Sequence, residues 1–126
     1  MCTGVGLDLC EISRMEKLKE DGRFLARFFT EAEGAYILGG GKAAAQRMAG
    51  IFAAKEAFGK SLGTGLAFDL REVEVAHTES GQPFYVLHGK AGEMGGGSRF
   101  LLSISHDGGI AGAVCVRETA DRSVPG

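Results

Sequence analysis

The chain has 126 residues, which fits a single domain, because domains commonly contain about 100–150 residues. Its 14 basic and 16 acidic side chains give a net charge of −2, which excludes the strongly basic composition typical of a nucleic-acid-binding protein. Apolar residues make up 44% of the chain, enough for a core, although 21 glycines indicate many turns and a thin core.

The cysteines and the N-terminal sequence give a prediction of the cellular compartment. The three cysteines, Cys2, Cys10 and Cys115, are odd in number and form no CxxC pair, which disfavours a disulfide framework or a structural zinc site. The first residues contain no basic segment or long apolar run, and no apolar run in the chain reaches membrane-spanning length. We therefore expect a cytoplasmic protein without membrane insertion, with one domain at 1–118 and a flexible tail at 119–126.

The N-terminal segment predicts a strand followed by a helix. Residues 3–10 alternate in polarity, which is typical of a strand, and Asp8 lies on the opposite face from the large apolar side chains. A helix is expected over Ser13–Glu20, because Ser13 and Glu16 have the spacing of a capping box. Gly22 is expected to end this helix.

Two more helical segments and a hinge are predicted next. Residues 23–29 favour a short turn of helix. Thr30 and Glu33 have the spacing of a second capping box, which predicts a helix from Thr30 to the three glycines at 39–41. We interpret those glycines as a linker, because a phosphate-binding GxxxxGK[ST] loop would also need a glycine at position 36 and a hydroxyl at position 43.

A long central helix and two pairs of strands complete the predicted fold. The alanine-rich segment 42–62 predicts this helix, and Gly63 occupies the position of a C-terminal cap. The other expected elements are a strand at 71–77, a turn at 79–83, a strand at 84–87, a weak helix at 88–97, and strands at 99–105 and 110–117 around a loop at 106–109.

Asp8 is the first candidate for chemistry. An ionised carboxylate in a strand of apolar residues is costly unless a cation, a hydrogen-bond donor or a metal compensates it. A structural aspartate that accepts backbone N–H groups explains the residue equally well. Asp8 alone therefore leaves both interpretations open.

Phe52, Glu56 and Lys60 recur at four-residue spacing, which places them on one face of the central helix. An ordinary surface pair of Glu56 with Lys60 is one interpretation. Together with Lys55 and Asp8, however, the set suits a site for Mg²⁺ and phosphate oxygens, because Mg²⁺ prefers oxygen ligands. We retain both alternatives.

Polar residues crowd the loop that separates the last two strands. Ser105, His106 and Asp107 supply a hydroxyl, an imidazole and a carboxylate where a hairpin needs only turn residues. Adjacent residues do not argue for a serine-hydrolase triad, whose members converge from separate segments. A loop histidine with only local contacts remains an alternative for His106, and His77 and His88 read as ordinary strand-end residues.

Several short motifs, in this order, resemble those of the holo-acyl-carrier-protein synthases. They are Gly4-Val5-Gly6-Leu7-Asp8-Leu9, Arg23-Phe24, Phe29-Thr30-Glu31-Ala32-Glu33, Phe52-Ala53-Ala54-Lys55-Glu56-Ala57, Lys60, Gly63-Thr64-Gly65 and Ser103-Ile104-Ser105-His106. The resemblance covers about residues 4 to 117, and FAAKEA with the following lysine and GTG is its most specific part.

The resemblance implies the α+β 4′-phosphopantetheinyl transferase fold, with an antiparallel sheet and a long central helix, assembled as a homotrimer. It implies transfer of 4′-phosphopantetheine from coenzyme A to a serine of an acyl carrier protein, which leaves adenosine 3′,5′-bisphosphate. Asp8 and Glu56 would hold Mg²⁺ and act in catalysis with Lys60 and with His106 of a neighbouring chain. Coenzyme A would meet the residues Arg47, Lys60, Gly63, Thr64, Ser105 and His106.

Basic side chains near the N-terminus suit an acidic carrier protein. The expected partner-binding residues are Arg14, Lys17, Arg23 and Arg27, although a solvated helix face is an alternative explanation. The sequence departs from the family at Ile51, where an arginine is usual. We expect either that Arg47, one turn earlier, substitutes for it or that coenzyme A binds more weakly. A non-catalytic carrier-protein or nucleotide-binding module with the same fold is the alternative function.

Overall fold

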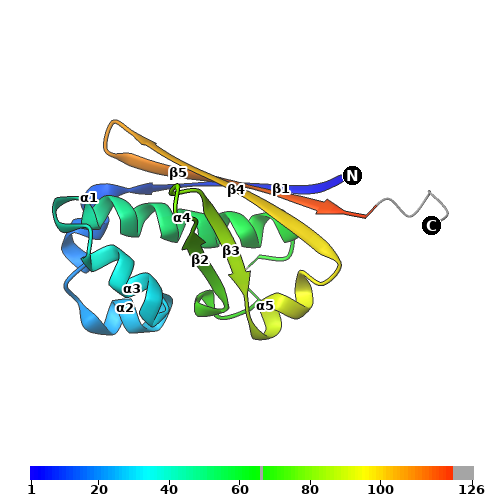
Figure 1. The fold of residues 1–126 in the computed structure, drawn as a ribbon, viewed down its shortest axis with the longest axis horizontal. Coiled ribbons are helices and arrows are strands. Elements are labelled where there is room, and N and C mark those ends of the chain that lie inside the picture. Colours follow the sequence, from blue (N-terminus) through cyan, green and yellow to red (C-terminus); the bar gives the residue numbers. More distant parts are fainter. Residues whose placement is uncertain (66, 121–126) are drawn as a thin grey trace.

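A three-stranded antiparallel sheet lies along one long helix in the computed structural model, which describes residues 1–65 and 67–120 (Figure 1). The elements are β1 (Cys2–Glu11), α1 (Ile12–Leu18), α2 (Gly22–Phe28), α3 (Glu31–Leu38), η1 (Gly41–Ala43), α4 (Ala44–Leu62), η2 (Leu70–Glu72), β2 (Val73–His77), β3 (Pro83–Leu87), α5 (Gly89–Met94), β4 (Ser98–Asp107) and β5 (Ile110–Thr119). The expected α+β class, with an antiparallel sheet and a long central helix, is confirmed.

The sheet has the order β1-β5-β4, and a separate hairpin joins β2 to β3. Helix α4 packs under the sheet, with α1, α2 and α3 near its first half and the β2–β3 hairpin and α5 beside its second half (Figure 1). Strand β1 pairs antiparallel with β5 from Cys2 opposite Glu118 to Glu11 opposite Ile110, with a shift in register between Cys2 and Gly4. Strand β1 is therefore one edge of the sheet and β4 the other.

Strand β1 contacts α4 so closely that two of its positions have no room for a side chain. A Cβ atom on Gly6 would lie 1.9 Å from the carbonyl oxygen of Ala57, and one on Gly4 would lie 2.1 Å from that of Ser61. Real Cβ atoms do not approach this closely, so any other residue would push the strand away from the helix. The GxG motif of the sequence therefore serves helix–strand packing.

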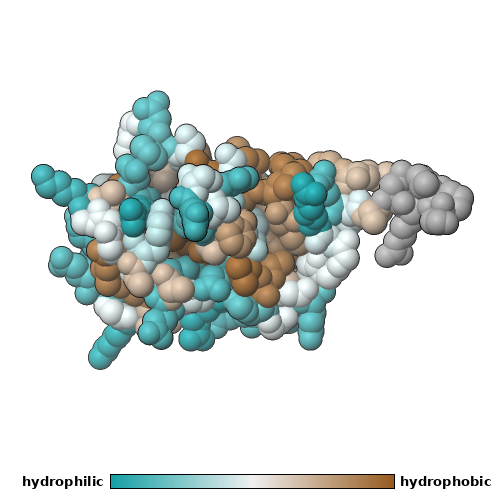
Figure 2. All heavy atoms as spheres, viewed as in Figure 1, coloured by the Kyte–Doolittle hydropathy of each residue, from teal (hydrophilic) through white to brown (hydrophobic). Residues whose placement is uncertain are grey.

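The alternation predicted for residues 3–10 is confirmed, but its large apolar side chains face away from α4. Val5, Leu7 and Leu9 are 62%, 60% and 65% exposed, and Leu101 on β4 is 40% exposed on the same face. Figure 2 shows apolar atoms at the surface along the side of the molecule where the sheet lies. The sheet thus has one face on the core and one open apolar face.

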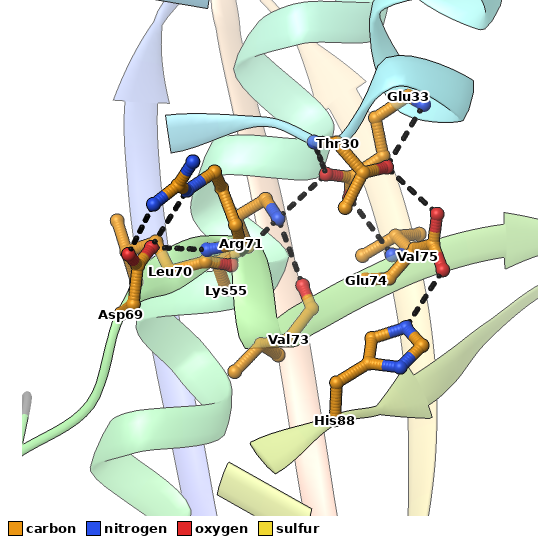
Figure 3. Close-up of polar contacts among 10 residues, drawn as sticks. All are labelled: Thr30, Glu33, Lys55, Asp69, Leu70, Arg71, Val73, Glu74, Val75 and His88. Carbon is orange, nitrogen blue, oxygen red and sulfur yellow. Dashed lines mark hydrogen bonds and ion pairs between the residues drawn. The ribbon is translucent and has the colours of Figure 1, made fainter. Parts of the chain in front are cut away.

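A buried ion pair joins α3 and α4 beneath the sheet. Lys55 Nζ donates to Glu33 Oε1 at 2.7 Å and to the carbonyl oxygens of Leu70 and Val73 at 2.9 and 2.8 Å (Figure 3). Both charged side chains are fully buried. Burial lowers the pKa of Lys55, and the negative charge of Glu33 opposes that effect. Every Lys55 proton therefore has an acceptor.

Glu33 extends this network to the start of its own helix and to β2. Its Oε1 accepts from Thr30 N at 2.9 Å, and its Oε2 accepts from Val75 N at 2.8 Å. Thr30 Oγ1 donates to Glu74, which also bonds His88 (Figure 3). The capping box predicted for Thr30 and Glu33 is confirmed.

The first predicted capping box is wrong. Helix α1 begins at Ile12 after Glu11, whose side chain makes no cap hydrogen bond, and it ends at Leu18, before the expected residue 20. The Ile12 N–H instead donates to the Gly109 carbonyl oxygen in the β4–β5 turn, at 3.0 Å. A tertiary contact therefore sets the start of this helix. Gly22 does not stop α1 but begins α2, where Asp21 caps the backbone.

Other boundaries move by one to three residues. The long helix begins at Ala44 after a 3₁₀ turn and ends at Gly63, which has the left-handed conformation predicted for a C-terminal cap (φ 74°). Strand β2 begins at Val73, and the weak helix is α5. The loop predicted at 106–109 is shorter, since β4 includes residues up to Asp107. Strand β5 includes Thr119, and residues 121–126 of the expected tail lie outside the described residues.

Within residues 1–65 and 67–120, no helix is both long enough and apolar enough to span a membrane.

Removing the buried cation should destabilise the fold strongly. In Lys55→Met, Glu33 stays buried without its cation, and breaking a buried ion pair in this way costs about 3–5 kcal/mol. The free energy of unfolding, measured by urea titration at pH 7, should fall by that amount. Lys90→Met on exposed α5 is the matched control, with an expected change within about 0.5 kcal/mol. Equal stability of the two variants would show that the pair is dispensable.

Candidate active site

Asp8 and Lys60 meet where β1 passes the C-terminal half of α4. Lys60 Nζ donates to Asp8 Oδ1 at 3.0 Å and to the Leu7 carbonyl oxygen at 3.0 Å. The Asp8 side chain is 20% exposed and that of Lys60 is 55% exposed, so the pair opens to solvent. The cation that the sequence required beside Asp8 is therefore Lys60.

Glu56 lies one helical turn before Lys60 and shares this corner. Partial burial raises the pKa of Glu56, and the nearby negative charge of Asp8 raises it further. The positive charges of Lys60 and Arg14 lower the pKa but do not cancel the increase. The two carboxylates therefore lie near each other, and the positive charges of Lys60 and Arg14 do not fully offset their repulsion and burial.

Such a pair of carboxylates suits a hard divalent cation. Mg²⁺ usually takes one or two protein carboxylates and completes its shell with water and substrate phosphates. The part of the chain that the structure describes holds no group of three His, Cys, Asp or Glu side chains that could bind a metal alone. Asp8 and Glu56 fit Mg²⁺ that is shared with a phosphate substrate.

Lys55 does not belong to this site, although the sequence suggested it. Neighbouring residues of an α-helix point about 100° apart, so Lys55 and Glu56 face different directions. Lys55 points into the core toward Glu33, whereas Glu56 points to the corner with Asp8. Gly63 and Thr64 are exposed just beyond Lys60, at the end of the same helix.

A second polar region lies at the other edge of the sheet. A pocket of about 190 Å³ there brings Arg47 on α4 together with Ser105 and His106 on β4. The Gln46 Nε2 amide donates to His106 Nε2 at 3.0 Å, a bond that requires the imidazole tautomer with its proton on Nδ1. Ile51, where the family resemblance suggested an arginine, lines the same pocket and contributes an apolar wall.

Arg47 is held in this pocket by contacts with α3. Its Nη1 donates to the Tyr36 carbonyl oxygen at 2.7 Å, and its guanidinium lies 4.3 Å from the centre of the Tyr36 ring. The Tyr36 ring also stacks on the imidazole of His77, with 4.2 Å between the ring centres. Burial and the charge of Arg47 lower the pKa of His77. His77 ends β2, as expected from the sequence, and it also stacks on Tyr36.

The two regions lie near opposite ends of α4. Lys60 binds Asp8 on the edge strand β1, whereas Gln46 binds His106 on the other edge strand, β4. Gln46 and Lys60 are fourteen residues apart, which corresponds to about 21 Å along an α-helix. Among the described residues, no hydrogen bond or ion pair joins His106 to Asp8, Glu56 or Lys60, which the family resemblance assigned to the same catalytic centre.

The expected partner-binding residues form an exposed basic surface on α1 and α2. Arg14, Lys17, Arg23 and Arg27 are all exposed, in agreement with the sequence interpretation of their accessibility. The guanidinium of Arg14 lies 5.5 Å from the ring centre of Phe52, and its charge reaches Glu56. The basic surface thus begins beside the carboxylate corner.

Sequence reasoning missed Gln46, Tyr36 and the part played by His77. Gln46 precedes Arg47 on the central helix, but nothing in its local sequence predicts a contact with His106, sixty residues away. Tyr36 follows the predicted capping box by one turn, and its contact with Arg47 depends on how α3 packs against α4. These partners come from tertiary structure.

Comparisons with known proteins agree with this fold and its motifs. A family model described as the 4′-phosphopantetheinyl transferase superfamily matches residues 4–96. A holo-acyl-carrier-protein synthase from Treponema denticola is 43% identical over 122 residues, which covers 94% of this chain and 99% of the relative. One from Trichlorobacter lovleyi is 44% identical over 126 residues, which covers 94% and 98%.

Solved structures are similar over nearly the whole chain. The synthase from Bacillus anthracis in complex with coenzyme A (3′,5′-ADP) has a TM-score of 0.80 and 32% identity, with 95% of this chain and 99% of that chain covered. The Helicobacter pylori synthase in complex with coenzyme A has a TM-score of 0.77 and 29% identity, with 90% and 99% covered. The chain therefore belongs to the 4′-phosphopantetheinyl transferase superfamily, within its holo-acyl-carrier-protein synthase family.

Neutralising Glu56 should stabilise the metal-free protein at neutral pH. Because folding raises the pKa of Glu56, its ionisation costs stability as the pH rises above the unfolded value of about 4.5. Glu56→Gln should therefore raise the melting temperature at pH 7 by a few degrees, and the gain should vanish below about pH 4.5.

Adding Mg²⁺ extends the same measurement. Mg²⁺ should raise the melting temperature of the wild type more than that of Glu56→Gln, because the variant lacks one of the two anionic ligands. Glu93→Gln, on an exposed residue of α5, is the matched control and should behave as the wild type. A lower metal-free melting temperature in Glu56→Gln would mean that the carboxylate stabilises the fold.

Proposed function

We propose that this chain transfers 4′-phosphopantetheine from coenzyme A to a serine of an apo acyl carrier protein and releases adenosine 3′,5′-bisphosphate. The observation that carries this proposal is the corner of Asp8, Glu56 and Lys60, where two carboxylates and a lysine converge beside an exposed basic surface. The relatives named holo-acyl-carrier-protein synthase cover nearly all of the chain, and two of the solved relatives contain coenzyme A.

The corner has the groups that phosphoryl transfer needs. The serine oxygen forms a bond to the pantetheine-bearing phosphorus of coenzyme A while the bond to the departing bisphosphate breaks, and a carboxylate of the corner or a water beside it takes the serine proton. Lys60 can bind a phosphate oxygen with the one ammonium proton that Asp8 and Leu7 do not use. Asp8 and Glu56 would hold Mg²⁺, which supplies charge stabilisation at the phosphates when it is bound. The attacking hydroxyl belongs to the carrier protein, so this chain needs no nucleophile of its own.

The pocket of Arg47, Ser105 and His106 is proposed to take the nucleotide phosphates. Arg47 supplies a permanent positive charge, and Ser105 and His106 supply hydroxyl and imidazole groups for hydrogen bonds. Gly63 and Thr64 are proposed to border the same substrate near Lys60. Arg47 can thus replace the charge that Ile51 lacks, since both residues line one pocket.

A homotrimer is proposed because one chain does not bring the two half-sites together. The apolar outer face with Val5, Leu7, Leu9 and Leu101 is large for a free surface and suits burial against another copy. Such packing would bring His106 of one subunit to the carboxylate corner of the next. We place the assembly in the cytoplasm, where the cysteines stay reduced.

Acyl carrier protein is proposed to dock on the basic surface of Arg14, Lys17, Arg23 and Arg27. Its negative charge would complement these exposed side chains, and Arg14 would guide the substrate serine toward Glu56. Contacts between exposed charges weaken as salt increases. Reversing the charge of Arg14 or Arg27 should therefore raise the carrier-protein KM far more than the coenzyme A KM, and this penalty should shrink as ionic strength increases.

The direct test is mass spectrometry of an apo acyl carrier protein after incubation with this protein, coenzyme A and Mg²⁺. The carrier should gain the mass of one phosphopantetheine group, and Asp8→Asn should reduce the rate by about 100-fold or more, because a charged ligand is lost. Glu93→Gln, the same carboxylate-to-amide change at an exposed residue of α5, is the control and should keep the wild-type rate.

A non-catalytic binding module gives a different result in this assay. It would bind coenzyme A or the carrier, as read by calorimetry, without any gain of mass. That outcome with folded protein and several carriers would refute the transferase function. Wild-type rates in Asp8→Asn would instead refute the metal-ligand role of Asp8.

A further inference from the structure

Arg47 depends on neighbours for its place in the pocket. Its side chain reaches from the first turn of α4 across the glycine turn to α3, where the Tyr36 carbonyl and ring hold the guanidinium. An arginine side chain loses much rotamer freedom when it is fixed, so a scaffold that fixes it in advance favours ligand binding. Tyr36 is half-buried and is itself stacked on His77 of β2.

Gly40 also affects the position of Arg47, because the Arg47 side chain passes directly over it. A Cβ atom at position 40 would lie 2.7 Å from Arg47 Cδ and 2.8 Å from Arg47 Nε. The backbone of Gly40 has φ −79° and ψ −9°, which any residue adopts. A side chain at position 40 would therefore displace the Arg47 side chain that passes over it, while the backbone could stay in place.

The charge of Arg47 has no equivalent among the residues that line the pocket. No other lysine or arginine lines it within the described part of the chain, because Ile51 is apolar and the remaining polar groups are uncharged or imidazoles. Burial and the positive charge of Arg47 both lower the pKa of His77, which keeps that imidazole neutral near pH 7. An anionic ligand therefore meets one fixed permanent cation.

We infer that Tyr36 is a positioning residue for coenzyme A binding, and that it acts together with Gly40 by holding the Arg47 guanidinium in the pocket. The inference rests on the proposed function, because it takes the phosphates of coenzyme A as the anion that Arg47 meets. Tyr36 does not contact the substrate in this account. The Tyr36 ring contacts the Arg47 guanidinium from the side of α3 and restricts its movement. Because Gly40 has no side chain, Arg47 can pass over it and reach the Tyr36 ring.

The inference makes a prediction for coenzyme A affinity measured by calorimetry. Tyr36→Leu keeps the backbone carbonyl but loses the ring, and should weaken binding about 2- to 5-fold, the range expected for a lost cation–π contact. Tyr36→Phe should bind within about twofold of the wild type. Arg47→Met should weaken binding by about tenfold or more.

A double-mutant cycle separates positioning from a structural role. In the Arg47→Met background, Tyr36→Leu should cause no further loss, because the side chain that it positions is absent. Gly40→Ala should weaken coenzyme A binding in the wild-type background and not in Arg47→Met. Gly34→Ala on α3, where an added Cβ meets nothing within 4 Å, is the matched control. Losses that persist in the Arg47→Met background, or no loss in Tyr36→Leu, would overturn the inference.

A second readout needs no substrate. In NMR spectra of the free protein, the Arg47 Nε–H signal should be shifted by the Tyr36 ring in the wild type and in Gly34→Ala. The shift should disappear in Tyr36→Leu and in Gly40→Ala. If the wild type fails to bind coenzyme A, the proposed function is refuted, and the NMR signal still decides whether Tyr36 positions Arg47. An unchanged Arg47 signal in both variants would show that it does not.

Discussion

The close packing of β1 on α4 is the constraint on which the carboxylate corner depends. Gly6 has no space for a side chain against the Ala57 carbonyl, so the strand backbone lies directly on the helix. At this separation Asp8, two residues further along β1, reaches Lys60 at 3.0 Å and raises the pKa of Glu56. A larger residue at position 6 would move Asp8 away from both partners. The glycine and the acid of the G-x-G-x-D motif therefore act together.

The same helix separates the remaining polar groups from that corner. Its first turns hold Gln46 and Arg47, which contact β4 and α3, and its last turns hold Glu56 and Lys60, which face β1. The buried pair of Lys55 and Glu33 fixes the helix against α3 on a third side. The proposed trimer would join the two polar regions by packing another chain against the open face of the sheet.

Local sequence patterns predicted those parts of the fold whose causes are local. The capping box of Thr30 and Glu33, the left-handed Gly63 and the long helix all depend on residues within a few positions of one another. The box at Ser13 failed because a backbone bond from Ile12 to Gly109, almost a hundred residues away, starts that helix earlier. Burial of Lys55 likewise depends on Glu33, twenty-two residues earlier in the chain.

The candidate site was predicted in part. Asp8, Glu56 and Lys60 come together as the spacing and the family resemblance indicated, while their roles in metal binding and catalysis remain predictions. The partners of Arg47 and His106 could not be predicted, because Tyr36 and Gln46 approach them only after α3, α4 and β4 have packed. The alternation of residues 3–10 defines two faces of the strand but does not say which face is buried. It therefore could not predict that Val5, Leu7 and Leu9 point away from the core.

The most direct test of shared sites is complementation between two inactive variants. Asp8→Ala and His106→Ala proteins, mixed in equal amounts under conditions where mass spectrometry shows subunit exchange, should regain about a quarter of the wild-type transfer activity, because one interface in four pairs an intact Asp8 with an intact His106. Each variant alone should stay inactive at every concentration. Activity that remains at background in the exchanged mixture would show that each site lies within one chain.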